Sequence, residues 1–266
     1  MINDLKNNLV LILNLFLIKP LYILIKLFFL PSEKLIKKLK FVGKFKVKIN
    51  NDKVFYLYNN GFFLENSVFW LGMENFKWEL MTRKIWTHLS KSSKVIFDIG
   101  ANTGIYSILS KTYNPDSKIF AFEPQPNIFR VLKINNQINY FDILCENIAI
   151  SNEEGEAPFF NYGSKTFSKR NTTAGSLNKN WRIKNQQSII VSVKELRTYI
   201  KEKKINRVDL IKIDVETFEY EVLDGFSEYL KILKPIIILE IQNQFIGSNI
   251  SSLISKKHYS FFNIDE

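Results

Sequence analysis

The chain has 266 residues, of which 46% are hydrophobic, and this length can bury one sizeable core with a small appendage. A single cysteine, Cys145, excludes a disulfide framework, and the two histidines, His88 and His258, lie far apart and outside any ligand-spaced motif. We therefore expect no metal site. The net charge of +11 would suit an anionic membrane, nucleic acid or an acidic substrate, but most lysines are scattered in a composition rich in lysine, asparagine and isoleucine.

The N-terminal segment contains a hydrophobic stretch, residues 9–30, that is long enough to cross a bilayer, which takes ~20 residues. Lys19, Pro20 and Lys26 interrupt this stretch, and Pro20 divides it because a proline kinks or ends a helix. Lysines follow within residues 34–40 and would hold the C-terminal side in the cytoplasm. Three alternatives remain: a peripheral or re-entrant membrane contact, a single-span anchor, or a helix buried against the catalytic domain or a partner subunit. We expect a cytoplasmic protein that contacts a membrane surface here, and the oligomeric state is not indicated.

The residues that follow predict a small β-hairpin and a helix. Alternating apolar and polar residues with Asn-Asn and Asn-Gly turn pairs indicate a hairpin between Phe45 and Leu64. Apolar residues at helical spacing predict a helix from about Glu74 to Leu89. Three segments are therefore expected, comprising residues 1–40, 41–90 and 91–266.

From residue 91 onward, apolar strands alternate with helices, which predicts a doubly wound α/β sheet that is mostly parallel. The continuous apolar runs are typical of strands that are covered on both faces. Strands are expected at residues 94–100, 118–124, 141–150, 208–215 and 234–241. Helices are expected at residues 105–113, 127–139, 192–203 and 218–226, the last ending near Gly225.

Carboxylates follow the predicted strands at the edge where ligands bind in such sheets. They are Asp98, Glu123, Asp214, Glu216 and Glu240. Gly100 and Gly104 form a tight turn after the first strand, but Asn102 stands where a dinucleotide fingerprint needs its middle glycine. The loop also lacks the ending of a phosphate-binding P-loop, so it suits a ligand with an amino-acid end and a ribose. Glu123, 25 residues after Asp98, can accept hydrogen bonds from ribose hydroxyls.

Several motifs occur together in an order that resembles one enzyme family. They are "VIFDIGANTGIYS", "FAFEPQP", "ENIAIS", "TTAGSL", "DLIKIDVETFEYEVLDG" and "IIILEI". From about Trp78 to Ile241 the chain resembles FkbM-family methyltransferases, which use S-adenosylmethionine and are usually O-methyltransferases. The resemblance implies a Rossmann-like class I methyltransferase fold over residues 91–266.

The same resemblance implies positions for the cofactor. Asp98, Gly100 and Asn102, in the loop that ends at Gly104, would lie near its methionine part. Glu123 would hold the ribose. The adenine would lie near Ile148, Ala149 and Ser151.

The sequence departs from the family in several places. Thr217 stands where the family usually has glycine, and it would either cap the next helix or narrow the approach to the methyl group. Ser192 opens a segment that usually begins Thr-Leu-Asp. After Glu240 only about one helix and one strand (residues 258–264) remain, so the final antiparallel strand pair of the family is expected to be incomplete.

For the chemistry, Asp214 is our first candidate to contact the cofactor or the acceptor, and Glu240 is the second, as a base. Glu216 is a third candidate catalytic residue, although it could equally be a helix N-terminal residue favoured by the helix dipole. Glu240 could instead be a strand-end carboxylate paired with a lysine. The polar, basic stretch at residues 152–187 could recruit an anionic acceptor or be a solvated loop.

We therefore expect a methyltransferase that acts on a hydroxyl of a glycan or another small molecule. The turn after the strand at residues 208–215 reads Asp-Val-Glu-Thr, which does not match the turn of base N-methyltransferases, so no nucleic acid partner is expected. Two alternatives remain open: an NAD(P)-binding oxidoreductase, and a catalytically degenerate methyltransferase-fold module at a membrane.

Overall fold

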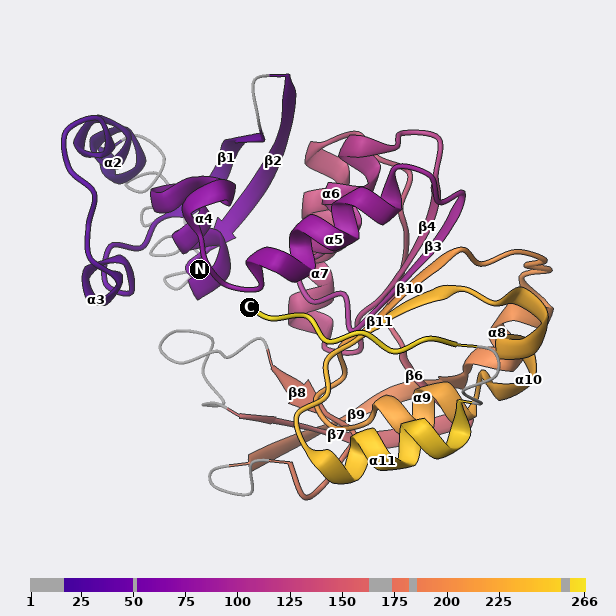
Figure 1. Ribbon diagram of the computed structural model, residues 1–266. Coiled ribbons are helices and arrows are strands. Elements are labelled where there is room, and N and C mark those ends of the chain that lie inside the picture. Colours follow the sequence, from indigo (N-terminus) through magenta and orange to yellow (C-terminus); the bar gives the residue numbers. More distant parts are fainter. Residues whose placement is uncertain (1–16, 50–51, 163–173, 182–185, 255–258) are drawn as a thin grey trace. The chain divides into compact units, whose positions relative to one another are not determined.

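The computed structural model describes residues 17–49, 52–162, 174–181, 186–254 and 259–266. Two units make up the chain (Figure 1), and each is described by itself. The smaller unit comprises the described residues up to Leu80 together with Gln137–Asn139. The larger unit comprises Met81–Asn136 and the described residues from Tyr140 to Glu266.

In the smaller unit, an antiparallel hairpin packs with short helices. Its elements are α2 (Lys19–Lys26), α3 (Glu33–Ile36), β1 (Val42–Ile49), β2 (Lys53–Asn60) and α4 (Phe63–Asn75). The predicted hairpin is confirmed, with Val42 paired to Asn60 and Ile49 paired to Lys53. Its core is aromatic: Phe69 packs edge-to-face on both Phe41 and Phe45, with ring centroids 4.4 and 5.5 Å away.

Helix α2 begins at Lys19 with Pro20 in its first turn, where a proline is tolerated because no intrahelical N–H bond is lost. None of its residues is buried within the smaller unit. Among the described residues, no helix combines the length and the apolar character needed to cross a membrane.

The helix predicted from Glu74 to Leu89 is interrupted. Helix α4 ends at Asn75, and α5 begins only at Leu80 and ends at Ser90. Phe76 is extended, with a ψ of 106°, and Glu79 has a left-handed φ of 45°, so the helical backbone cannot run through them.

The larger unit contains a five-stranded parallel sheet in the order β11-β10-β3-β4-β5. The strands are β3 (Val95–Ile99), β4 (Lys118–Phe122), β5 (Leu144–Glu146), β10 (Leu210–Ile213) and β11 (Ile236–Leu239). The helices are α5, α6 (Ile105–Tyr113), α7 (Pro126–Ile138), α8 (Leu196–Glu202), α9 (Glu219–Asp224), α10 (Ser227–Leu233) and α11 (Gln244–Leu253). The predicted α/β class with a parallel sheet is confirmed. The strand order reverses between β3 and β10, and such a switch point is where open α/β sheets bind ligands.

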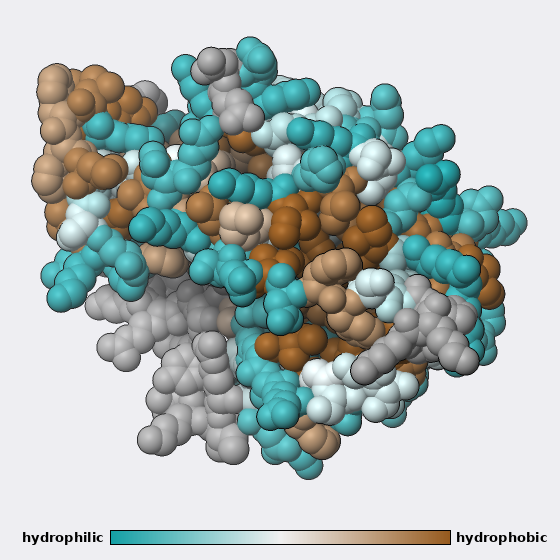
Figure 2. Space-filling view, in the orientation of Figure 1, coloured by the Kyte–Doolittle hydropathy of each residue, from teal (hydrophilic) through white to brown (hydrophobic). Residues whose placement is uncertain are grey.

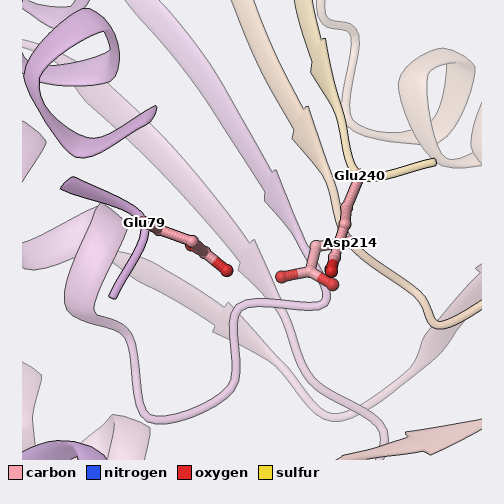
Figure 3. Close-up of side chains that lie close together, drawn as sticks. All are labelled: Glu79, Asp214 and Glu240. Carbon is pink, nitrogen blue, oxygen red and sulfur yellow. The ribbon is translucent and has the colours of Figure 1, made fainter. Parts of the chain in front are cut away.

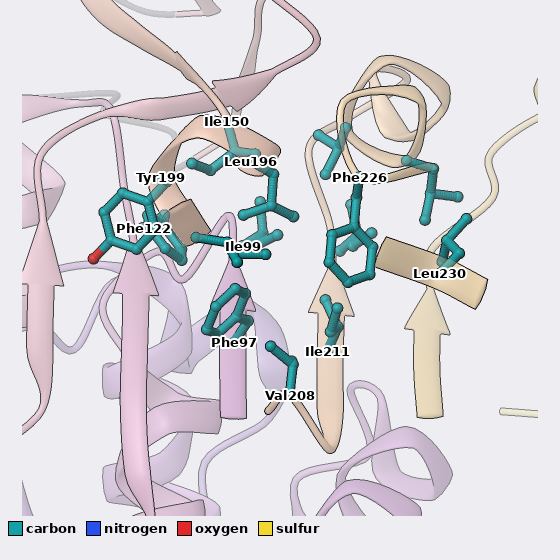
Figure 4. Packing of buried hydrophobic residues seen from close by; sticks show 14 of the residues in the cluster. Phe97, Ile99, Phe122, Ile150, Leu196, Tyr199, Val208, Ile211, Phe226 and Leu230 are labelled. Atoms are coloured by element: carbon teal, nitrogen blue, oxygen red, sulfur yellow. The ribbon is translucent and has the colours of Figure 1, made fainter. Parts of the chain in front are cut away.

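Alternate residues of the central strands face opposite layers of helices. Phe97, Ile99 and Ile211 face a core that includes Leu196 of α8 and Phe226 just before α10 (Figure 4). On the other side of β3, the side chain of Asp98 meets Ser107 of α6. Because both faces are covered, the strands are mostly apolar, as predicted, with Asp98 in β3 and Lys212 in β10 as the buried exceptions.

The strand predicted at residues 141–150 is two strands in different sheets. β5 closes the central sheet, whereas β6 (Ala149–Ser151) belongs to a second sheet, ordered β6-β9-β7-β8. Between them, the side chain of Asn147 donates hydrogen bonds to the carbonyls of Glu123 and Pro124. The pairing of β5 with β4 ends at Glu146, and the side chain of Asn147 holds the next residues against the end of β4.

The described part of the polar stretch at residues 152–187 contains two strands and the start of a third. β7 (Gly155–Tyr162) pairs antiparallel with β9 (Gln186–Glu195) and with the short β8 (Gly175–Ser176). The helix predicted from Ser192 therefore begins only at Leu196, because residues 192–195 belong to β9. The basic residues at 165, 169, 170, 182 and 184 lie outside the described residues.

The C-terminal end follows the prediction in part. Helix α11 follows β11, but residues 259–266 form no strand where the structure describes them. Instead, the carboxylate of Glu266 accepts hydrogen bonds from the backbone N–H groups of Met81 and Thr82.

Candidate active site

The loop after β3 has left-handed backbone at Gly100, Asn102 and Gly104, with φ values of 77°, 53° and 89°. A Cβ on Gly100 would lie 1.9 Å from the carbonyl oxygen of Asp214, and one on Gly104 would lie 2.4 Å from Cδ1 of Leu132. Both glycines are therefore required by backbone conformation and by packing. The loops that follow β3 and β10 consequently touch, backbone to backbone.

Asp98 lies inside β3 and is fully buried. Its Oδ2 accepts hydrogen bonds from the backbone N–H (3.0 Å) and the hydroxyl (2.6 Å) of Ser107. Its Oδ1 is also buried but accepts no hydrogen bond from the protein. Burial raises the pKa of Asp98, although the nearby ammonium of Lys212 opposes this shift. The arrangement leaves one buried oxygen able to receive a donor.

Glu123 follows β4 directly, and its side chain is turned back into the site. Oε2 accepts from the backbone N–H of Asn102 at 3.0 Å, and Oε1 accepts from that of Gln125 at 2.8 Å. The residue is 5% exposed, and this burial raises its pKa to about 8 despite the two N–H bonds. Glu123 and the loop after β3 are thus one hydrogen-bonded assembly.

Lys212 was not predicted as a site residue, yet it lies at the centre of this edge of the sheet. It pairs in register with Asp98, and its Nζ lies 2.6 Å from Oδ2 of Asp214 and 4.5 Å from the ring centroid of Tyr106. Its side chain is only 5% exposed. The signal was available in the sequence, because a lysine inside an otherwise apolar strand must find a partner when it is buried.

Asp214 and Glu240 follow the neighbouring strands β10 and β11, and their carboxyl groups lie close together (Figure 3). Burial alone would raise the pKa of Asp214, but Lys212 and a hydrogen bond with Glu240 hold it below its usual value. The two carboxyl groups therefore form one interacting pair at this edge of the sheet, with Lys212 beside Asp214.

The loop after β10 is strained and held by a buried side chain. Glu216 and Thr217 have left-handed φ values of 55° and 76°. Oε1 of Glu219 accepts hydrogen bonds from the backbone N–H groups of Val215 (3.3 Å) and Thr217 (3.1 Å). Glu219 is fully buried, and burial raises its pKa to about 7. The positive φ explains why glycine suits the position of Thr217.

The side chains of this loop contact the segment that follows β8. Oε2 of Glu216 accepts hydrogen bonds from Nε1 of Trp181 at 3.2 Å and from the side chain of Gln242. Oγ1 of Thr217 accepts from Nδ2 of Asn178 at 2.9 Å.

Two sequence-based readings of this loop are therefore wrong. Thr217 does not cap the next helix, because α9 has Phe218 as its N-cap residue and no side-chain capping bond. Glu216 is not a helix N-terminal residue, because α9 begins at Glu219. Both side chains instead fix the segment after β8 against the end of β10.

The residues expected near adenine are only partly brought to this edge. Ile148 follows Asn147, whose side chain reaches the end of β4. Ala149 is buried in the apolar cluster of the second sheet, and the Ser151 hydroxyl donates to the side chain of Asn152. Ile148 is therefore next in sequence to a residue that contacts Glu123. The side chain of Ala149, in contrast, packs within the apolar cluster of the second sheet.

Gly225 ends α9 as predicted, but for another reason. Its φ is −63°, which any residue can adopt. A Cβ there would lie 2.3 Å from the carbonyl oxygen of Ser151, so close packing of α9 on β6 requires the glycine.

Comparisons with known proteins identify the family of the chain. The family model described as the methyltransferase FkbM domain matches residues 98–261, which begin at Asp98 and include every candidate carboxylate. This match is to a methyltransferase family, so the NAD(P)-binding alternative is set aside.

Curated relatives match the same region. The methyltransferase sdnD of Sordaria araneosa is 25% identical over 192 residues, covering 63% of this chain and 74% of its own length. The hexuronic acid methyltransferase AglP of Haloferax volcanii is 21% identical, covering 64% of this chain and 65% of its own. The 31-O-demethyl-FK506 methyltransferase FkbM of Streptomyces tacrolimicus is 27% identical, covering 50% and 60%. This chain thus spans less than two thirds of the last two relatives. From the family match, the chain belongs to the FkbM methyltransferases, whose methyl donor is S-adenosylmethionine.

Proposed function

We propose that the protein transfers the methyl group of S-adenosylmethionine to a hydroxyl oxygen of a sugar or another small molecule. One observation carries the proposal: carboxylates from four strand ends gather where the strand order of the parallel sheet reverses, and two of them, Asp98 and Glu123, are buried. Asp98 and Glu123 stand on one side of the switch point, and Asp214 and Glu240 stand on the other.

The residues present fit the cofactor. The buried Oδ1 of Asp98 has no protein donor and can accept a hydrogen bond from the amino group of the methionine part. Each oxygen of Glu123 already accepts one backbone N–H and keeps a lone pair for a ribose hydroxyl. The left-handed loop through Gly100, Asn102 and Gly104 would line the methionine part, and the adenine would lie beside Ile148, with Ala149 and Ser151 behind it.

The sulfonium of the donor supplies an already activated methyl group, so the protein has to orient the acceptor and accept its proton. Asp214 is ionised because Lys212 lies beside it, and it is our candidate for contacting the acceptor hydroxyl. Glu240 follows β11 beside Asp214 and is our second candidate, as a base that would accept the acceptor proton. Glu216 would act by positioning, through its contacts with Trp181 and Gln242.

The names of the relatives support the acceptor class. AglP acts on a hexuronic acid, and the 2-O-methyltransferase NoeI of Sinorhizobium fredii, 26% identical over 160 residues, is named for an oxygen acceptor. We therefore propose a polyhydroxylated acceptor, with uronic acids as the first compounds to test.

Calorimetry with S-adenosylhomocysteine tests the cofactor site. The wild type should bind, and Asp98→Ala and Glu123→Ala should each weaken binding by at least tenfold, since each removes charge-assisted hydrogen bonds of roughly 1.5–3 kcal/mol. Asp116→Ala removes an exposed carboxylate outside the site and should leave binding unchanged. A folded wild type that does not bind the ligand contradicts the proposal.

Labelled S-adenosylmethionine with a panel of uronic acids tests the transfer. Asp214→Asn should lower turnover at least a hundredfold, because general-base catalysis typically contributes 10²–10⁴-fold. A methyl ether survives alkali, whereas a methyl ester does not. Label that is released by alkali would mean that the acceptor is the carboxylate rather than a hydroxyl.

We also propose that the protein meets the cytoplasmic face of a membrane through residues 9–30. The support is the exposure of apolar side chains at Leu17 and beyond, within the described part of this segment. The first check is fractionation of cells that express the full chain. Recovery of the protein only in the soluble fraction would contradict this location.

A further inference from the structure

Helix α2 and the residues after it present an apolar face to the outside of the smaller unit. Leu17, Leu21, Leu24 and Phe28 recur every three or four residues, so they lie on one side of the helix. Their exposed fractions are 62%, 53%, 56% and 85%. Figure 2 shows this surface in brown at the position that α2 takes in Figure 1. The other exposed apolar residues of this stretch are Ile23, Leu27, Phe29 and Leu30.

The two lysines of α2 point the opposite way, toward the hairpin and α4. Lys19 donates a hydrogen bond to the carbonyl of Lys44 at 2.5 Å. Lys26 donates to the carbonyl of Phe69, and its ammonium lies 5.3 Å from the centroid of the Phe69 ring. Tyr22 lies on the same side and contacts the ring of Trp70 at 5.2 Å. A helix of a water-exposed surface normally has the reverse polarity, with apolar residues inward and charges outward.

A cluster of positively charged residues follows α2 in the sequence. Residues 34–48 contain seven lysines and no carboxylate. Lys34, Lys38 and Lys40 are exposed next to α3, and Lys46 and Lys48 are exposed on β1. The combination of an outward apolar stripe and adjacent exposed lysines is typical of a segment that lies in the interface of a membrane with anionic lipids.

We propose that α2 with residues 27–30 forms a docking face that lies flat on an anionic bilayer. Leu24 and Phe28 enter the boundary between headgroups and acyl chains, and the lysines of residues 34–48 meet the headgroups. A second copy of the chain is the poorer occupant, because the lysines of residues 34–48 in the two copies would lie close together and repel one another. The inference deepens the membrane contact proposed above and is independent of methyl transfer.

Co-sedimentation of the full chain with vesicles tests the face. The protein should pellet with mixed phosphatidylglycerol and phosphatidylcholine vesicles, and more weakly with phosphatidylcholine alone. The double variant Leu24→Ser/Phe28→Ser should bind at least roughly tenfold more weakly, since two apolar insertions are lost. Lys34→Gln/Lys38→Gln/Lys40→Gln should weaken binding to the anionic vesicles by up to about fivefold per charge.

The matched control is Phe245→Ser/Phe262→Ser, which removes two phenylalanines of the larger unit that are 75% and 86% exposed. This variant should bind vesicles as the wild type does. No binding by the wild type, an equal loss in the control, or full binding by Leu24→Ser/Phe28→Ser would overturn the docking face. A wild type that ignores vesicles but forms dimers, which the Leu24→Ser/Phe28→Ser variant loses, would also overturn it and assign the face to a second copy. Calorimetry with S-adenosylhomocysteine on every variant separates this result from a failure of the methyltransferase proposal.

Discussion

The side chain of Glu123 links burial, protonation and cofactor binding in one group. Its pKa of about 8 in the folded protein lies above its ordinary value of 4.5 because burial penalises the charge. The stability that this group contributes is therefore fully present below pH 4.5 and is lost as the pH rises through 8. Ribose hydroxyls would donate to the ionised form, so binding should favour deprotonation.

The affinity for S-adenosylhomocysteine should therefore rise with pH up to about 8, by at most roughly tenfold per pH unit, because only the ionised Glu123 accepts both ribose hydroxyls. Calorimetry across this range measures how the affinity changes with pH. The Glu123→Gln variant should bind more weakly, and its affinity should not change with pH. A wild-type affinity that stays flat with pH would show that Glu123 is not the ribose acceptor.

Lys212 is the residue whose removal should cost the most stability in this site. Lys212→Met leaves Asp98 and Asp214 buried without their cation, and breaking a buried ion pair typically costs roughly 3–5 kcal/mol. Urea unfolding measures the loss. Lys194→Met breaks the partly exposed pair with Glu202 and should cost less than about 1 kcal/mol. Equal losses of stability in the two variants would contradict the role of Lys212 as the buried cation of this site.

At the scale of an element, the loop after β10 combines strain with restraint. Two consecutive non-glycine residues, Glu216 and Thr217, have left-handed backbone, which costs roughly 1–2 kcal/mol each. Glu219 accepts hydrogen bonds from the backbone of the loop, and Asn178 and Trp181, in the segment after β8, hydrogen-bond its side chains. Strain of this kind persists where the surroundings over-determine it, often beside a functional site.

Substitutions at Thr217 separate the strain from the hydrogen bond. Thr217→Ala and Thr217→Gly both lose the bond from Asn178, but glycine also relieves the positive φ, so the glycine variant should be about 1 kcal/mol more stable than the alanine variant. Thermal unfolding measures the difference. Thr198 in α8 also makes one side-chain hydrogen bond, to Glu195, and there alanine should be the more stable by about 1 kcal/mol. If the same substitution, alanine or glycine, gave the more stable variant at both positions, the backbone strain at Thr217 would be contradicted.

At the scale of the whole molecule, the fold of the larger unit predicts which residues a bound ligand protects from hydrogen exchange. S-Adenosylhomocysteine at a hundred times its Kd should stabilise the protein by about 2.7 kcal/mol, slowing hydrogen exchange by up to roughly a hundredfold. Mass spectrometry should find this protection at residues 98–104, 123–125 and 214–219, which meet at the switch point. Protection confined to residues 17–80 would place the site elsewhere.

The sequence predicted the central sheet and its carboxylate edge well, because both follow from local patterns. Short runs of mostly apolar residues before Asp98, Glu123, Asp214 and Glu240 mark parallel strands and their ligand-binding ends. The second sheet was missed because β7 and β9 are separated by more than twenty residues, and strand pairing at that distance leaves no local periodicity. The break at Asn147 was missed because its cause is a side-chain contact with the end of β4.

By itself, the sequence determined the class of this protein: alternating strands and helices, a loop unsuited to pyrophosphate, and the family motifs around Asp98 and Asp214. Only the tertiary structure decided which carboxylates work together and in what charge state. Burial by the surrounding fold raises the pKa of Glu123 and Glu219. Lys212, two residues away, lowers the pKa of Asp214, and it does so because the fold buries both side chains together. The polarity of α2 was likewise decided by folding, because Lys19 and Lys26 interrupt the apolar stretch in sequence but turn inward to carbonyl partners in space. Charge and burial depend on what surrounds a side chain in three dimensions, and the order of residues does not specify those surroundings.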